Sequence, residues 1–298
     1  MKVFLGVPRG FCAGVVRAID IVEVALKKYG SPIYVKHQIV HNPHVVSDLE
    51  SKGAITVENV DEIPEGSRVV FSAHGSPPSD FESARLRNLQ VIDATCPLVI
   101  KVHNEAKKYD REGRKIILVG HKGHQEVKGT MGQTQMDLLD DRESFVPANE
   151  NSNTPVTILT QTTLSVDDTE ASIKAVQGFY SDVVVRNDLC YATTNRQNAV
   201  KEISEFVELF LVIGAQNSSN CNRLREVAES KGLPAYLINS VKELNSEWIR
   251  NVNNIGITSG ASTPDTLVQE VISFLNPDEV VHMGGEEENI KFVMPRGL

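Results

Sequence analysis

Long apolar runs are absent from this chain of 298 residues, and no segment approaches the roughly 18 consecutive apolar residues that a membrane helix needs. The first residues also lack the apolar core of a secretion signal, so we expect a cytoplasmic location and no membrane partner. Basic charge is scarce too, since 30 Lys and Arg face 39 Asp and Glu, giving a formal net charge of −9. This balance argues against nucleic acid as a main partner.

Cysteine is equally scarce, with four residues: Cys12, Cys96, Cys190 and Cys221. In a reducing compartment we expect no disulfide framework. The paired spacing of cysteines that is typical of structural zinc sites is absent. A P-loop is absent as well, because neither Gly214 nor Gly260 is followed by Gly-Lys-Ser/Thr. Any site must therefore be assembled from single residues in separate loops.

What is present is an ordinary globular composition, 41% hydrophobic and 23% charged, with short Val/Ile/Leu runs between helix-like stretches. Runs of this kind predict buried parallel strands in α/β units. The predicted strands are Lys2–Val7, Ile33–Val35, Arg68–Ser72, Val91–Asp93, Lys115–Val119, Val156–Thr160, Asp182–Val185, Leu209–Ile213 and Asn254–Thr258. Helical periodicity predicts helices over Val15–Tyr29 and Ala192–Phe206.

A strand–loop–Cys–helix unit recurs along the chain. Cys12, Cys96 and Cys190 each follow a predicted strand and precede a predicted helix, at intervals of 84 and 94 residues. Repetition at this scale predicts three similar α/β lobes with mainly parallel sheets, arranged around a pseudo-threefold axis. The predicted boundaries are residues 1–95, 96–189 and 190–276, with an extended C-terminal tail over 277–298.

The three repeated cysteines suggest a metal centre. A helix N-terminus lowers the pKa of a thiol and favours the thiolate that binds metals. Three thiolates with no obvious fourth ligand fit a [4Fe–4S] cluster that leaves one iron open for substrate. The alternative is three buried thiols at turns, and the matched contexts favour the cluster. Cys221 lies outside the repeat, where a fourth-ligand role or an oxidation-sensitive thiol are the alternatives to a buried residue.

Polar residues follow many of the predicted strands, where open α/β sheets place their ligand sites. Neutral hydrogen-bond donors predominate, which suits a phosphorylated ligand held by imidazoles and helix N-termini. The candidates are His41, His74, His124, Thr162, Ser218, Ser219, Asn220 and Ser262. Pro43, Pro97 and Pro264 fit first helical positions, which would place His41, Cys96 and Ser262 at helix starts. Each candidate could instead be a helix cap or a core residue.

Glu126 stands in a loop that contains two histidines and is a candidate general acid, because burial can raise the pKa of a carboxyl toward neutrality. The alternative is a helix-start glutamate favoured by the helix dipole. We assign no site role to the remaining histidines His37, His44, His103 and His282.

Taken in order, these motifs resemble those of the IspH/LytB family, the 4-hydroxy-3-methylbut-2-enyl diphosphate reductases. The resemblance covers nearly the whole chain. It rests on Pro8-Arg9-Gly10-Phe11-Cys12-Ala13-Gly14, Val40-His41-Asn42, Ser72-Ala73-His74-Gly75, Asp93-Ala94-Thr95-Cys96-Pro97, Thr160-Gln161-Thr162-Thr163-Leu164-Ser165-Val166-Asp167-Asp168, Cys190-Tyr191-Ala192-Thr193-Thr194-Asn195-Arg196-Gln197, Asn217-Ser218-Ser219-Asn220, Gly260-Ala261-Ser262 and Glu287-Glu288-Asn289-Ile290.

The resemblance implies one central [4Fe–4S] cluster on Cys12, Cys96 and Cys190, with one open iron. It implies the last step of the non-mevalonate route of isoprene biosynthesis, a two-electron, two-proton removal of an allylic hydroxyl. The products are isopentenyl and dimethylallyl diphosphate. Glu126 would donate the proton and Thr162 would act with it at the substrate hydroxyl. The diphosphate would lie on His41, His74, His124, Ser218, Ser219, Asn220 and Ser262.

Two departures from the family pattern are visible. Gln125 stands where the family usually has proline, which could alter how Glu126 is oriented, and Cys221 stands where a small polar residue is expected. The implied electron donor is a carrier such as ferredoxin or flavodoxin with its reductase. Two other functions remain open: an iron–sulfur enzyme similar to quinolinate synthase, and a non-enzymatic, metal-containing sensor of phosphorylated metabolites.

Overall fold

The computed structural model describes residues 1–147, 151–285, 288–295 and 297–298. The chain divides into two compact units. Unit 1 comprises Met1–Val16, His41–Val45 and Cys190–Lys291, and unit 2 comprises Arg17–Val40, Val46–Leu189 and Phe292–Leu298. Among the described residues, no helix is both long and apolar enough to cross a membrane.

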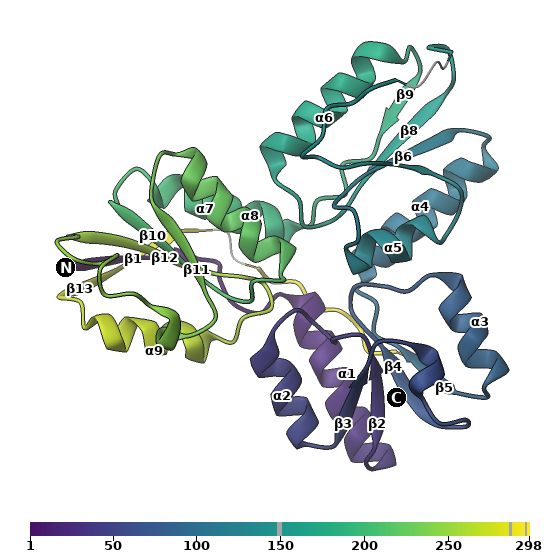
Figure 1. Cartoon of the computed structure of the whole chain (residues 1–298), viewed down its shortest axis with the longest axis horizontal. Coiled ribbons are helices and arrows are strands. Elements are labelled where there is room, and N and C mark those ends of the chain that lie inside the picture. The colour runs from purple at the N-terminus through teal and green to yellow at the C-terminus, as the bar shows by residue number, and fades with distance from the viewer. Residues whose placement is uncertain (148–150, 286–287, 296) are drawn as a thin grey trace. The chain divides into compact units, whose positions relative to one another are not determined.

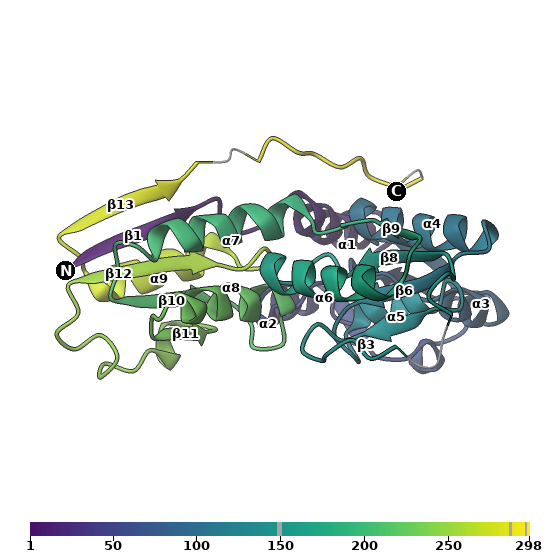
Figure 2. The ribbon, with the colours of Figure 1, turned by 90° about the horizontal axis from the view of Figure 1, so that it is seen from above.

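Unit 1 contains a five-stranded sheet in which all neighbouring strands are parallel (Figure 1). Its strands, in spatial order, are β11 (Ala235–Ile238), β10 (Leu209–Ile213), β12 (Asn254–Ser259), β1 (Lys2–Val7) and β13 (Glu279–Gly284). Its helices are α7 (Tyr191–Ile203), α8 (Ser219–Ser230) and α9 (Asp265–Leu275), with a 3₁₀ turn at Val241–Glu243. Figure 2 shows β13 beside β1 at the edge of this sheet.

Both faces of this sheet are covered, which explains why its central strands are apolar without alternation. Leu211 packs on the face covered by α9, whereas Phe210 packs on the face covered by α7 and α8. Neighbouring residues of a strand point to opposite faces, so each must be apolar. Full burial of such a side chain contributes roughly 1.5–3 kcal/mol.

Unit 2 contains two four-stranded parallel sheets. The first consists of β3 (Ala54–Val57), β2 (Ile33–Lys36), β4 (Arg68–Phe71) and β5 (Gln90–Asp93), and the second of β7 (Asp137–Leu139), β6 (Lys115–Val119), β8 (Val156–Thr160) and β9 (Val183–Val185). The helices are α1 (Ala13–Tyr29), α2 (Pro43–Ser51), α3 (Pro78–Leu86), α4 (Pro97–Arg111), α5 (Gln125–Met131) and α6 (Val166–Phe179), with a 3₁₀ turn at Val60–Glu62. The first residues of α1 and α2 belong to unit 1.

The predicted α/β class with parallel sheets is confirmed, and so is every strand that the sequence predicts, within one residue at its ends. Two features differ from the predicted lobes. Strand β1 pairs with β12 and β13 rather than with the strands of residues 33–93, and residues 279–284 of the expected tail form β13. The arrangement of three lobes around an axis stays a prediction.

Candidate functional site

Three cysteines occupy the same position relative to a helix. The carbonyls of Cys12, Cys96 and Cys190 accept the first helical hydrogen bonds of α1, α4 and α7, from Val16 N at 3.0 Å, Ile100 N at 2.9 Å and Thr194 N at 3.1 Å. Among the described residues none of the three forms a disulfide, and all three are partly exposed. The matched strand–loop–Cys–helix units of the sequence are thereby confirmed. Cysteines outside disulfides at three helix starts have the chemistry that a thiolate-bound metal centre requires.

Within unit 1, Cys12 and Cys190 both lie near the hydroxyl of Tyr191. This hydroxyl accepts a hydrogen bond from Ala13 N at 3.2 Å. Burial raises the pKa of Tyr191 to about 12, and its Coulomb interactions with Cys12, Glu288 and Cys190 add to the rise. The two cysteines therefore share one neighbourhood of this unit.

Within unit 2, the backbone of Cys96 is hydrogen-bonded to the loop that carries His74. Cys96 N donates to the carbonyl of Ala73 at 3.0 Å. The rings of His74 and His124 meet edge to face with centroids 6.1 Å apart. His37, to which we assign no role from the sequence, contacts His74 with centroids 5.8 Å apart, while its Nδ1 lies 2.8 Å from Glu58 Oε2. Its left-handed backbone, with φ of 61°, has no signal in the sequence.

Glu126 is a buried carboxyl of unit 2, only 4% exposed, in the first turn of α5. Thr162 donates to it twice, from its amide to Oε1 at 2.7 Å and from its hydroxyl to Oε2 at 3.0 Å. Burial raises the pKa of Glu126 to about 7, although the two bonds from Thr162 lower it. His124 caps the helix, since its Nδ1 accepts a hydrogen bond from Glu126 N at 3.2 Å. Both expectations for Glu126, a helix-start position and a shifted pKa, are met.

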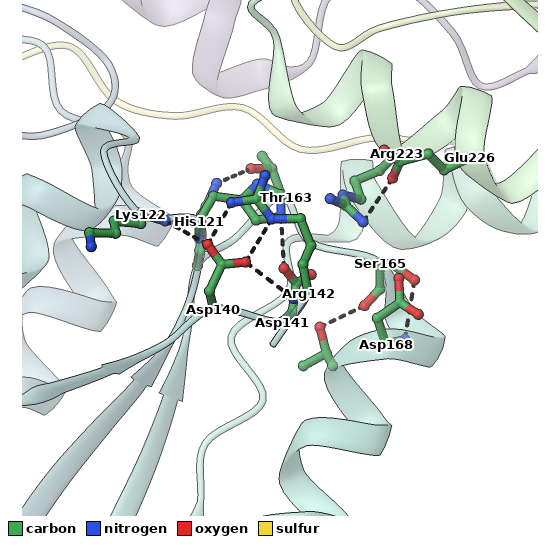
Figure 3. Close-up of polar contacts among 12 residues, drawn as sticks. His121, Lys122, Asp140, Asp141, Arg142, Thr163, Ser165, Asp168, Arg223 and Glu226 are labelled. Carbon is green, nitrogen blue, oxygen red and sulfur yellow. Dashed lines mark hydrogen bonds and ion pairs between the residues drawn. The ribbon is translucent and has the colours of Figure 1, made fainter. Parts of the chain in front are cut away.

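The loop before His124 is fixed from two sides. His121 N donates to Gln161 Oε1 at 3.0 Å, and Lys122 N donates to Asp140 Oδ2 at 3.1 Å. Figure 3 shows Arg142 on the same Asp140 carboxylate, with Nε 2.7 Å from Oδ1 and Nη2 2.6 Å from Oδ2. Arg142 holds the pKa of Asp140 far below its usual range. The exposed guanidinium of Arg142 thus balances the buried carboxylate of Asp140, and the carboxylate in turn holds the loop before His124 and Glu126.

Unit 1 holds the predicted serine and asparagine donors. Ser218 caps α8, and its hydroxyl accepts from Cys221 N at 3.4 Å. Asn220 is 5% exposed, and both polar atoms of its amide are buried without a partner among the described residues. Ser262 Oγ donates to the carbonyl of His41 at 3.1 Å. A buried amide with unused hydrogen-bonding capacity is what a bound polar ligand would satisfy.

One expectation requires correction, the helix start near Ser262, and for Cys221 the two alternatives to a buried residue do not hold. Cys221 is fully buried in the core between α7, α8 and the sheet, and burial raises the pKa of its thiol. A protonated thiol without solvent access is neither an oxidation-sensitive group nor a ready metal ligand. Pro264 caps α9, which begins one residue later, so Ser262 lies three residues before the first helical residue. The tail motif is only partly described, because Glu287 lies outside the described residues.

The parallel sheets make the chain an α/β enzyme. Its candidate acid Glu126, buried with Thr162, lies beyond the carboxyl ends of β6 and β8, where α/β sheets place their ligand sites. The family model described as "LytB protein" matches residues 3–276, and the chain belongs to this family.

The sequence is similar over nearly its whole length to reductases from other organisms. The 4-hydroxy-3-methylbut-2-enyl diphosphate reductase of Burkholderia pseudomallei is 49% identical and covers 100% of this chain and 97% of its own length. The corresponding reductase 2 of Bradyrhizobium diazoefficiens is 50% identical, with 100% and 99% covered. The solved structure of the E-1-hydroxy-2-methyl-but-2-enyl-4-diphosphate reductase from Plasmodium falciparum matches with a TM-score of 0.94 and 37% identity, covering 99% of this chain and 96% of that one. Enzymes of this family are iron–sulfur proteins.

Proposed function

We propose that the chain is a 4-hydroxy-3-methylbut-2-enyl diphosphate reductase, the terminal enzyme of the non-mevalonate pathway. The substrate takes up two electrons and two protons, its allylic C–O bond breaks, and the products are water and either isopentenyl or dimethylallyl diphosphate. The observation that carries the proposal is the buried Glu126 carboxyl, whose pKa of about 7 is held between burial and two hydrogen bonds from Thr162.

Cys12, Cys96 and Cys190 would hold a [4Fe–4S] cluster. The three cysteines are partly exposed, lie outside disulfides and occupy equivalent helix starts, which fits this group. When bound, such a cluster supplies single electrons and an open iron that acts as a Lewis acid. The donor of those electrons would be a carrier such as ferredoxin or flavodoxin with its reductase. The cytoplasmic location stays a prediction.

Glu126 would donate the proton that lets the hydroxyl leave as water. A general acid works best when its pKa lies near the working pH, which is the case here. Thr162 orients the carboxyl, because it donates to both carboxylate oxygens and leaves little freedom of rotation. Its hydroxyl can exchange its bond to Glu126 for a bond to the substrate hydroxyl.

The diphosphate would be bound by neutral donors. His74 and His124 supply imidazoles in unit 2, and His41 supplies another in unit 1. The remaining donors belong to unit 1: Ser218, Ser219, Asn220 and Ser262. Asn220 supports this role most directly, since its buried amide has no protein partner among the described residues.

The test is turnover of the hydroxylated diphosphate under anaerobic conditions with a chemically reduced electron donor. Glu126→Gln removes the proton but keeps the shape of the side chain, and we expect it to lose at least about a hundredfold in kcat. Glu65→Gln is the control, because Glu65 is exposed and has no role in the proposed site. Wild-type protein without turnover would favour a metabolite sensor, and turnover of a different substrate would favour a quinolinate-synthase-like enzyme.

A further inference from the structure

Arg196 is the largest fully buried side chain of the described residues, and it holds the loop before Cys12. Its Nη2 donates to the carbonyl of Gly10 at 2.9 Å, two residues before the cysteine. The guanidinium is balanced by Glu288 of the C-terminal segment, with Nη1 2.7 Å from Oε1 and Nη2 3.2 Å from Oε2. All of these contacts lie within unit 1.

Arg17 makes an equivalent arrangement in unit 2, where it holds the loop before Cys96. Its Nη1 donates to the carbonyls of Ala94 at 3.3 Å and Thr95 at 3.1 Å, the two residues that precede the cysteine. Its Nε donates to the carbonyl of Val293 at 2.8 Å, so the C-terminal segment again supplies the second partner. The side chain is 8% exposed.

We propose that Arg17 and Arg196 are positioning residues for the metal centre, and that the segment Glu288–Val293 holds both arginines in their working orientation. This inference rests on the proposed function, in which Cys12 and Cys96 bind the cluster. Each arginine binds one or two backbone carbonyls within the two residues before a cysteine, and the conformation of these residues sets the direction in which the following thiol points. Within the part of the chain that the structure describes, the hydrogen bonds of the two arginines go to backbone carbonyls and to Glu288, and none goes to a side chain proposed to bind the substrate.

Arginine suits this role because its planar guanidinium offers several donors in a fixed geometry. Gly10 has a φ of 69°, and because a glycine backbone populates negative φ about as readily, a hydrogen bond to its carbonyl helps to keep the loop in this conformation. A buried guanidinium that loses its carboxylate is left as an uncompensated charge, which destabilises its buried position and favours movement of the side chain toward solvent. Loss of Glu288 would therefore loosen the Cys12 loop, whereas loss of Arg17 would loosen the Cys96 loop.

Amide hydrogen exchange of the apoprotein tests separately the loop before Cys12, which Arg196 contacts, and the loop before Cys96, which Arg17 contacts. We expect Glu288→Ala to speed exchange of the amides of residues 10–12 by more than about tenfold while residues 94–96 are unchanged. Glu288→Gln should give a smaller effect of the same pattern. Arg17→Lys keeps the positive charge but loses the several donors of the guanidinium, and it should speed amide exchange of residues 94–96 alone. Lys291→Ala is the control, because Lys291 is an exposed neighbour in the same segment.

Cluster retention supplies the second readout. After reconstitution, Glu288→Ala and Arg17→Lys should lose iron to a chelator more than about tenfold faster than wild type, and Lys291→Ala should match wild type. Wild-type protein that takes up no cluster would refute the proposed function. Wild-type protein that holds a cluster, with variants that release iron and exchange amides at the wild-type rate, would instead overturn the role of the two arginines.

Discussion

The Glu126 carboxylate accepts a hydrogen bond from Thr162 at each of its two oxygens, one from the amide at 2.7 Å and one from the hydroxyl at 3.0 Å. The residues are 36 positions apart and follow the neighbouring strands β6 and β8. The pair is buried, and the threonine lowers a pKa that burial raises. Removing one of the two hydrogen bonds should therefore change the pKa of Glu126 and leave the carboxyl in place.

Thr162→Val deletes the hydroxyl bond and keeps the amide bond. Because the hydroxyl lowers the pKa of Glu126, its loss should raise that pKa and move the alkaline limb of the pH–rate profile to higher pH. We also expect kcat to fall at least about tenfold, as for the loss of a hydrogen bond to a charged group. Thr162→Ser keeps the hydroxyl and should behave as wild type. An unchanged limb in Thr162→Val would show that the hydroxyl does not act on Glu126.

Glu126 should also make the stability of the fold depend on pH. Its pKa is about 7 in the folded chain against an ordinary value of 4.5, so the folded state keeps the proton longer. This favours folding below about pH 4.5, and the advantage is lost as pH rises through 7, a change of about 3 kcal/mol. Glu126→Gln cannot ionise and should lack this loss. Denaturant unfolding of the wild-type and Glu126→Gln apoproteins at about pH 5 and about pH 8 measures this loss of unfolding free energy. An equal loss in both proteins would contradict the prediction.

The cysteines should separate into two kinds. Cys96→Ser should lose the cluster, whereas Cys221→Ser should keep it, because Cys221 is fully buried in the core. The Cys221 Sγ also fills the space beside Gly214 and Gly260, where an added Cβ would lie 2.3 and 2.2 Å from the sulfur. Cys221→Val should therefore overpack the core and cost about 1–3 kcal/mol. Iron content and unfolding free energies check these outcomes, and loss of iron in Cys221→Ser would contradict the account.

Gln125→Pro should stabilise the chain by about 0.5–1 kcal/mol without loss of activity. Gln125 is the first residue of α5, where proline fits, and the preceding His124 already has the extended backbone that a residue before proline needs, with ψ of 141°. The orientation of Glu126 is set by Thr162 and not by this position. Gln125→Ala separates the effect of the lost glutamine side chain. A lower melting temperature for Gln125→Pro than for Gln125→Ala would contradict this expectation.

The central strands could be predicted from the sequence and several edge strands could not. The unpredicted strands β3, β7, β11 and β13 all lie at sheet edges. An edge strand has less apolar surface to bury, and β13 is largely exposed along its length. The pairing of β1 with β12 was beyond sequence reasoning as well, since a parallel crossover can return to any neighbour in the sheet.

The candidate site was predictable as a set of residues but not as a network. Strand ends and helix starts indicate the cysteines, Glu126 and Thr162 from the sequence. Arg17 and Arg196 give no such signal, because an arginine in a helix is ordinarily exposed and its partners here come from the far end of the chain.

The measurement that tests the central claim most directly is iron and acid-labile sulfide on anaerobically purified protein, with absorbance spectra before and after the hydroxylated diphosphate is added. The account predicts about four irons and four sulfides per chain, and a spectral change when the substrate reaches the open iron. Stoichiometric zinc without sulfide would contradict it, since the chain would then lack a source of single electrons for the reduction.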